Sequence, residues 1–154
     1  MDILKEIKKE HEEFRNLAAA IENSQDKKKK QLFEELYVNL FGHHEAEEHV
    51  LFPDVKKNSD DEGKDIVREM IEEHDLLVYQ LSVIQKTPLT DETWNAKFSI
   101  LKELLIHHLD EEEKSLFKQA KKVLGEEVLK AKYEPFEVTM EKYKGQQENK
   151  LKSQ

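Results

Sequence analysis

The hydrophobic residues recur three and four positions apart in four long stretches, which is the spacing of helices with one apolar face. The first stretch runs from Ile3 to about Asn23, and Asp2 is placed to cap it. The second runs from Leu32 to about Asn58, although we expect Pro53 to kink it or to loosen its last turn. The third lies over residues 64–86 and the fourth over residues 92–124.

Short polar segments separate these stretches. They are Ser24–Lys30, Ser59–Gly63 and Thr87–Asp91. Connections of this length join helices that run antiparallel to their neighbours, so the pattern predicts an all-α, up-down-up-down four-helix bundle over residues 1–124. We expect Gly125 to end or interrupt the fourth helix, residues 125–144 to form a short extra helix packed on the bundle, and residues 145–154 to be a frayed polar tail.

The composition supports the helical prediction. Charged residues make up 38% and hydrophobic residues 37%, with 4 Gly and 3 Pro, a balance that favours long amphipathic helices over a turn-rich sheet. The net charge of 25 − 34 = −9 would repel nucleic acid and anionic membranes, so we exclude both as partners. There is no cysteine and no run of the roughly 18 apolar residues that a membrane helix needs, and we expect a cytoplasmic protein.

Candidate chemistry lies in a repeat with an offset of 65 residues, the distance from His43 to His108. The matching residues are His43, Glu47, Glu48, Leu51 and Phe52 in the first copy and His108, Glu112, Glu113, Leu116 and Phe117 in the second. A second echo matches Glu10-His11 with Glu73-His74. Each half of the chain therefore supplies one lone His and one His-x3-Glu pair.

This spacing predicts a site for two metal ions. Positions i and i+4 lie one above the other on a helix, so each His-x3-Glu pair can offer a ring nitrogen and a carboxylate to one point in the core. The predicted ligands are His11, His43, Glu47, His74, His108 and Glu112, with the two carboxylates bridging the ions. A mixed set of imidazole and carboxylate donors favours iron or manganese over a sulfur-rich zinc site, and the residues alone do not choose between the two.

The doublets His43-His44 and His107-His108 leave other registers open, because His44/Glu48 and His107/Glu111 have the same spacing. We favour His43 and His108, since only this pairing aligns Leu51-Phe52 with Leu116-Phe117. We interpret His44, His49 and His107 as surface or supporting residues. The chain has no Glu-x-x-His and no second His at the zinc-protease spacing, which excludes the ferritin-type and zinc-protease motifs.

In these residues the chain resembles the hemerythrin-like, or HHE cation-binding, family over about residues 3–120. The resemblance implies a non-haem di-iron centre that meets dioxygen, peroxide or nitric oxide. Oxygen-carrying hemerythrins have a His-x3-His pair in the third helix, but here the fourth residue after His74 is Val78. In addition, Glu112 lies four rather than five positions after His108. The set is similar instead to that of di-iron proteins linked to nitric-oxide stress and iron–sulfur repair.

Those proteins often carry a cysteine-bearing N-terminal segment, which this cysteine-free chain lacks. The resemblance therefore implies binding, sensing or detoxifying a small oxidant, or handling iron, and leaves open whether there is turnover. The alternative is a helical module that binds a protein partner and whose cation is structural or absent. The two differ in whether the protein holds redox-active metal.

Overall fold

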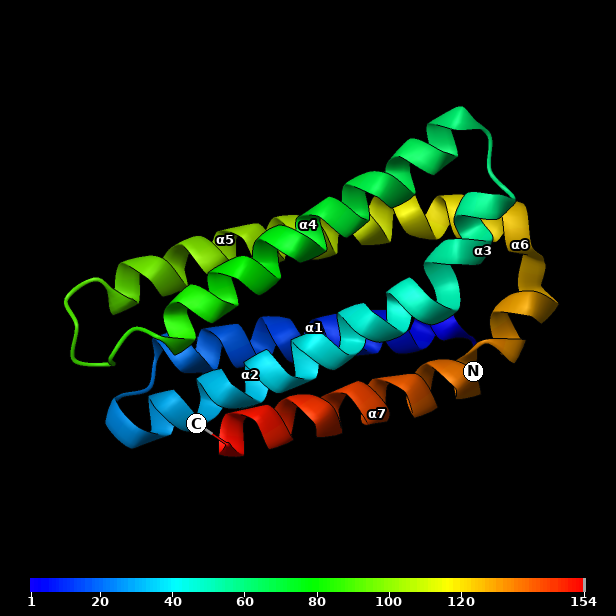
Figure 1. Cartoon of the computed structure of the whole chain (residues 1–154). Helices are drawn as coiled ribbons and strands as arrows, with labels where there is room; N and C mark the ends of the chain where they lie inside the picture. The colour runs from blue at the N-terminus through cyan, green and yellow to red at the C-terminus, as the bar shows by residue number, and fades with distance from the viewer. Residues whose placement is uncertain (154) are drawn as a thin grey trace.

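Four long antiparallel helices form a bundle in this computed structural model, which describes residues 1–153 (Figure 1). They are α1 Ile3–Glu22, α2 Asp26–Ala46, α4 Asp61–Gln85 and α5 Trp94–Glu111. The Asp2 carboxylate accepts from the Lys5 backbone N–H at 3.0 Å, and Asp60 caps α4 by accepting from the Gly63 N–H at 2.9 Å. Every regular element over residues 1–153 is helical, which confirms the predicted all-α bundle.

Helices α2 and α5 each lead into a single π-turn, which is one residue wider than an α-helical turn. Each π-turn lies within one copy of the repeat. The wide turns are η1 Glu47–Leu51 and η2 Glu112–Leu116, and they lead into α3 Phe52–Lys57 and α6 Phe117–Ala131. In η1 the Phe52 N–H reaches the Glu47 carbonyl, five residues back. Pro53 then falls in the first turn of α3, where its missing N–H costs little. The expected disturbance near Pro53 is therefore a wide turn that begins before it, and π-turns of this kind are frequent at functional sites.

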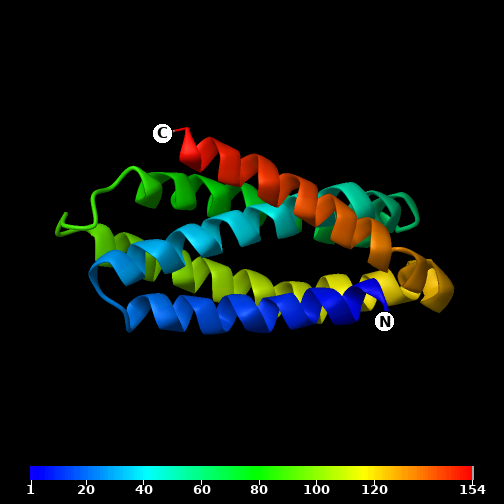
Figure 2. The same cartoon turned by 90° about the horizontal axis from the view of Figure 1, so that it is seen from below.

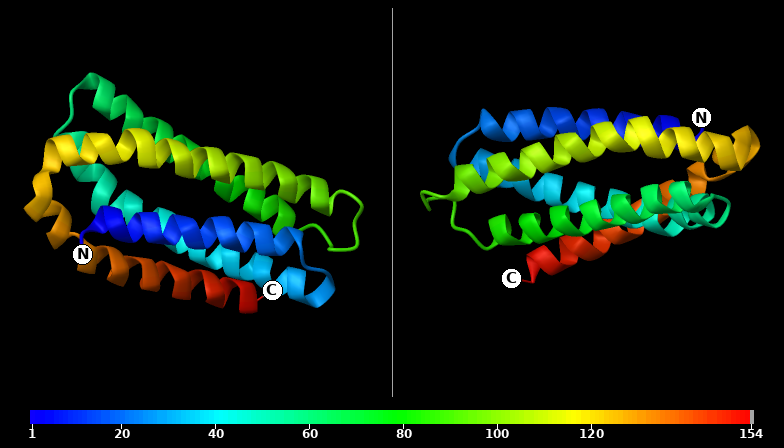
Figure 3. Two further views of the ribbon diagram at one scale, coloured as in Figure 1. Left: turned by 180° about the vertical axis from the view of Figure 1, so that it is seen from behind. Right: turned by 90° about the horizontal axis from the view of Figure 1, so that it is seen from above.

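The C-terminal helix is longer than we predicted. Gly125 has φ +77°, a left-handed conformation that suits glycine, and bends α6 back toward the bundle. Helix α7, Tyr133–Lys152, then packs along α2 (Figures 2 and 3). Gly42 permits this approach, since a Cβ there would lie 2.9 Å from the Met140 carbonyl oxygen. We expected a frayed tail after residue 144, whereas α7 continues to Lys152, with Gln147 buried and Leu151 half-buried.

The core consists of two apolar clusters with a polar layer between them. One cluster contains Ile7, Leu51, Met70 and Leu116 among its members. The other contains Phe14, Leu40, Leu77 and Leu105. On each long helix the sequence passes from one cluster to the other through a buried His or Glu, so the bundle brings these polar side chains to one level. Over residues 1–153, no helix has an apolar stretch long enough to span a membrane.

Candidate metal centre

Seven polar side chains fill the layer between the two apolar clusters, and each is at most 2% exposed. Six are the residues that the repeat predicted: His11 from α1, His43 from α2, Glu47 from η1, His74 from α4, His108 from α5 and Glu112 from η2. The seventh is His44, which we expected at the surface or in a supporting place. The bundle therefore brings all six predicted residues together and adds one.

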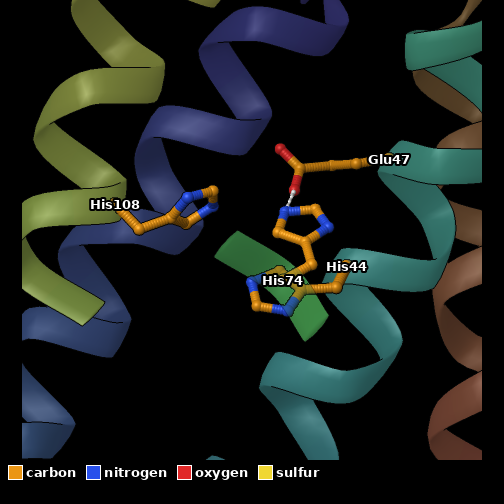
Figure 4. A group of neighbouring side chains, drawn as sticks. All are labelled: His44, Glu47, His74 and His108. Carbon is orange, nitrogen blue, oxygen red and sulfur yellow. Dashed lines mark ion pairs between the residues drawn. The ribbon is translucent and has the colours of Figure 1, made fainter. Parts of the chain in front are cut away.

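These residues form two groups, in each of which one donor atom per residue lies within 4.8 Å of the others. We call them group 1, which is His11, His43, Glu47 and Glu112, and group 2, which is His44, Glu47, His74 and His108 (Figure 4). Glu47 belongs to both groups, with its Oε1 at 3.4 Å from His43 Nε2 and 3.2 Å from His74 Nε2.

Glu112 also lies between the groups. Its Oε1 is 3.1 Å from His11 Nε2, and its Oε2 is 3.5 Å from His108 Nε2. The two carboxylates thus stand where each could bridge a pair of ions, as the sequence predicted for them.

A second set of carboxylates bonds the imidazole rings at Nδ1, on the side of each ring that faces away from the centre. The Nδ1 atoms of four rings each bond one glutamate: His11 to Glu113 at 2.8 Å, His43 to Glu10 at 2.7 Å, His74 to Glu48 at 2.7 Å and His108 to Glu73 at 2.6 Å. An ionised carboxylate only accepts, so Nδ1 donates. When such a ring is neutral, its Nε2 carries no proton and faces the centre, which is the arrangement in which metal-bound histidines are usually held.

The inward-facing atoms have no hydrogen-bond partner. These buried, unpartnered atoms are Nε2 of His11, His43, His74 and His108, both ring nitrogens of His44 and both carboxylate oxygens of Glu47 and Glu112. Buried polar atoms are rarely left unpaired, because each costs the free energy of its lost hydration. Cations placed between these converging donors would satisfy them together, so the residues present fit a metal centre.

His44 is buried, which excludes the surface position and leaves the supporting one of the two places that we expected for it. It is 2% exposed, and its ring stacks on that of His74 with 3.7 Å between centroids. Burial lowers its pKa well below the usual value, and the nearby His74 and His108 lower it further. His44 is consequently neutral at pH 7 and has a lone pair free to bind an ion. Helix α4 packs on the side of α2 that carries His44. The apolar stripe of α2 does not predict this contact, because His44 lies outside the stripe.

The other alternative donors do not reach the polar layer. His49 and His107 are exposed, so the expectation for these two agrees with the structure. His49 bonds the Glu45 carbonyl through Nδ1 and lies beside Tyr143. Glu48 holds His74 from behind, and Glu111 accepts a hydrogen bond from the Ser115 hydroxyl. The geometry thus favours the register with His43 and His108 facing inward.

The charges of the layer depend on one another. Burial by itself lowers the pKa of His108, but the carboxylates of Glu112 and Glu73 outweigh it and raise the pKa to about 9. The same balance of burial against nearby carboxylates raises the pKa values of His11, His43 and His74. With a pKa of about 9, His108 holds a second proton at pH 7 when no ion is present, so metal binding at its Nε2 must displace that proton.

The repeat builds the site with approximate two-fold symmetry. Glu10 and Glu73, each just before a lone His, hold the His of the neighbouring helix in the same half. Glu48 and Glu113 each follow a glutamate that lies between the two groups, and each holds the lone His of the other half. The repeat aligns all four of these glutamates but does not predict this role. The aromatic rings repeat as well: Phe52 stacks on His74 and Phe117 on His11.

The supporting carboxylates lead to a testable expectation. Replacing Glu73 by Gln should weaken metal binding by roughly 10- to 100-fold without removing a ligand, since His108 loses its ionised partner. Competition with a chromogenic chelator would measure the affinity. The exposed neighbour gives a matched control, Glu72→Gln, which should bind metal like the wild type. Equal affinities for the two variants would show that Glu73 does not act on the centre.

Comparisons with known proteins agree with this geometry. A family model described as the hemerythrin HHE cation binding domain matches residues 2–120. Among solved structures, the chain is similar to the crystal structure of a hemerythrin HHE cation binding domain-containing protein, the Rv2633c homolog from Mycobacterium kansasii. The identity is 24% over 100% of this chain and 94% of that chain, with a TM-score of 0.85, a likeness that shows the fold. No match was found among curated proteins.

Proposed function

Because the chain belongs to the hemerythrin HHE cation-binding domain family, we propose that its polar layer holds two iron ions and that this pair binds, senses or detoxifies a small oxidant. The observation that carries the proposal is the sharing of Glu47 between group 1 and group 2. Two sets of donors joined by a carboxylate suit a pair of ions rather than one. The mixed nitrogen and oxygen donors suit iron, or manganese as the nearest alternative.

The proposed ligand set has five imidazoles and two carboxylates. His11 and His43 would bind one ion, and His44, His74 and His108 the other, with Glu47 and Glu112 between them. Group 1 offers fewer protein donors than group 2 once Glu112 is counted with both. An open coordination position for a small oxidant is therefore best placed at the ion that group 1 would bind.

An iron pair would supply redox chemistry and open coordination positions. The chain's own residues control its surroundings. Glu10, Glu48, Glu73 and Glu113 orient the rings. Phe14 packs edge-on against His43, with centroids 5.1 Å apart, and Phe52 covers His74, so apolar groups separate the layer from bulk water. These contacts admit a small uncharged molecule more readily than a large or charged one.

Metal analysis of the protein purified without chelator tests the proposal. We expect two irons per chain and a visible spectrum that changes on exposure to air, peroxide or nitric oxide. The variant His43→Ala/His108→Ala removes one ring from each group and should lose the iron. Full iron occupancy in this variant would refute the ligand assignment.

The outcome also separates the proposal from the alternative of a helical interaction module. A wild-type protein that never holds redox-active metal, yet melts at the same temperature with and without chelator, would favour the module. Stabilisation by metal without any spectral response would instead limit the role of the ions to structure.

A further inference from the structure

A third cluster of donors lies outside the seven residues of the polar layer. Glu6 and Glu10 of α1 and Glu137 of α7 each bring a carboxylate oxygen to within 4.8 Å of the others. Glu6 and Glu10 are both only 5% exposed, and Glu137 is partly buried. Helix α7 begins beside the N-terminal end of α1, so the extra helix completes this cluster (Figure 3).

Three buried oxygens of the cluster have no partner. They are Oε2 of Glu6, Oε2 of Glu10 and Oε1 of Glu137. Lys9 lies 4.0 Å from the other oxygen of Glu6, and its side chain is 62% exposed. Its charge is therefore well screened and leaves the three oxygens unpaired. Burying carboxylates this close together is costly unless a cation or a proton compensates them.

We propose that Glu6, Glu10 and Glu137 bind a divalent cation at a site of their own, separate from the two groups of the polar layer. An all-carboxylate set with positions left for water suits hard cations such as Mg²⁺, Ca²⁺ or Mn²⁺, or Fe²⁺ before it is oxidised. None of its members belongs to group 1 or group 2. The site therefore has ligands of its own.

Glu10 connects the proposed cation site to the polar layer. Its Oε1 accepts from His43 Nδ1 at 2.7 Å, while its Oε2 is one of the three unpaired oxygens. Burial and the nearby Glu10 and Glu6 raise the pKa of Glu137 to about 7, which reflects the concentration of negative charge. A proton is consequently the competitor of the cation, and the test must distinguish the two.

Counting bound Mn²⁺ tests the site. Protein whose polar layer has already been loaded with metal is dialysed against Mn²⁺, and the bound ion is measured by metal analysis and electron paramagnetic resonance. Wild type should bind one Mn²⁺ per chain more than Glu137→Gln, which keeps the shape of the side chain and removes one charge. Glu6→Gln changes a different helix and should lose the same ion, so the test does not depend on the folding of one variant.

The matched control is Glu148→Gln, an exposed glutamate three turns further along α7, which should bind as wild type does. Equal Mn²⁺ binding by wild type, Glu137→Gln and Glu6→Gln would overturn the proposal and leave the proton as the compensating charge. Because the readout is the difference between variants, it is independent of whether the polar layer binds iron.

Discussion

Replacing Glu47 by Gln should reduce the metal content from two ions per chain to fewer than one. Glu47 is fully buried and contributes to both groups, with one oxygen 3.4 Å from His43 Nε2 and 3.2 Å from His74 Nε2. The amide keeps the shape but loses the negative charge that offsets two cations. The loss of affinity should exceed the roughly 10- to 100-fold that the removal of a supporting carboxylate costs.

Metal analysis after gel filtration checks this, with Glu35→Gln as the control. Glu35 is an exposed glutamate on α2, three turns before Glu47. It should retain two ions per chain. If Glu47→Gln retains both ions, the shared carboxylate is not what holds the pair together.

Replacing His44 by Ala should leave about one ion per chain. Group 2 loses one of its three imidazoles, whereas group 1 keeps all its members. The result shows whether His44 is a metal ligand or only packs against His74, because a ring that only packs could be removed without the loss of an ion. Metal content and the intensity of the iron spectrum both report the change.

The doublets of the repeat supply the control for this variant. His107 takes the place beside His108 that His44 takes beside His43, but it is exposed, and His107→Ala should keep both ions. Two ions per chain in both variants would show that His44 is a buried neutral ring without a role in binding. The proposed ligand set would then contain only the four imidazoles that the repeat predicted.

The sequence predicted the bundle and the six inward-facing residues because each rests on a strong periodic signal. Apolar spacing placed His11 and His74 on the stripes of their helices, and the repeat chose between His43 and His44 as the residue that matches His108. These features depend on one helix at a time. They can be read without knowing which helices are neighbours.

The burial of His44 and the extension of the C-terminal helix beyond residue 144 were not predicted, because both depend on contacts between helices. His44 lies about 100° around α2 from His43, off the apolar stripe, and it is buried only because α4 packs there. Residues 145–152 carry Leu151 as their one hydrophobic residue, so their pattern does not predict packing, whereas Gln147 is buried in the structure. The supporting glutamates were visible in the repeat, but their role depends on contacts between helices.

The polar layer divides the core of the bundle into two apolar halves. Above and below it the helices are joined by buried hydrocarbon, while within it they meet through groups that favour a cation. We therefore expect the two apolar clusters to assemble the helices before metal is bound, unlike small domains that fold only around their metal.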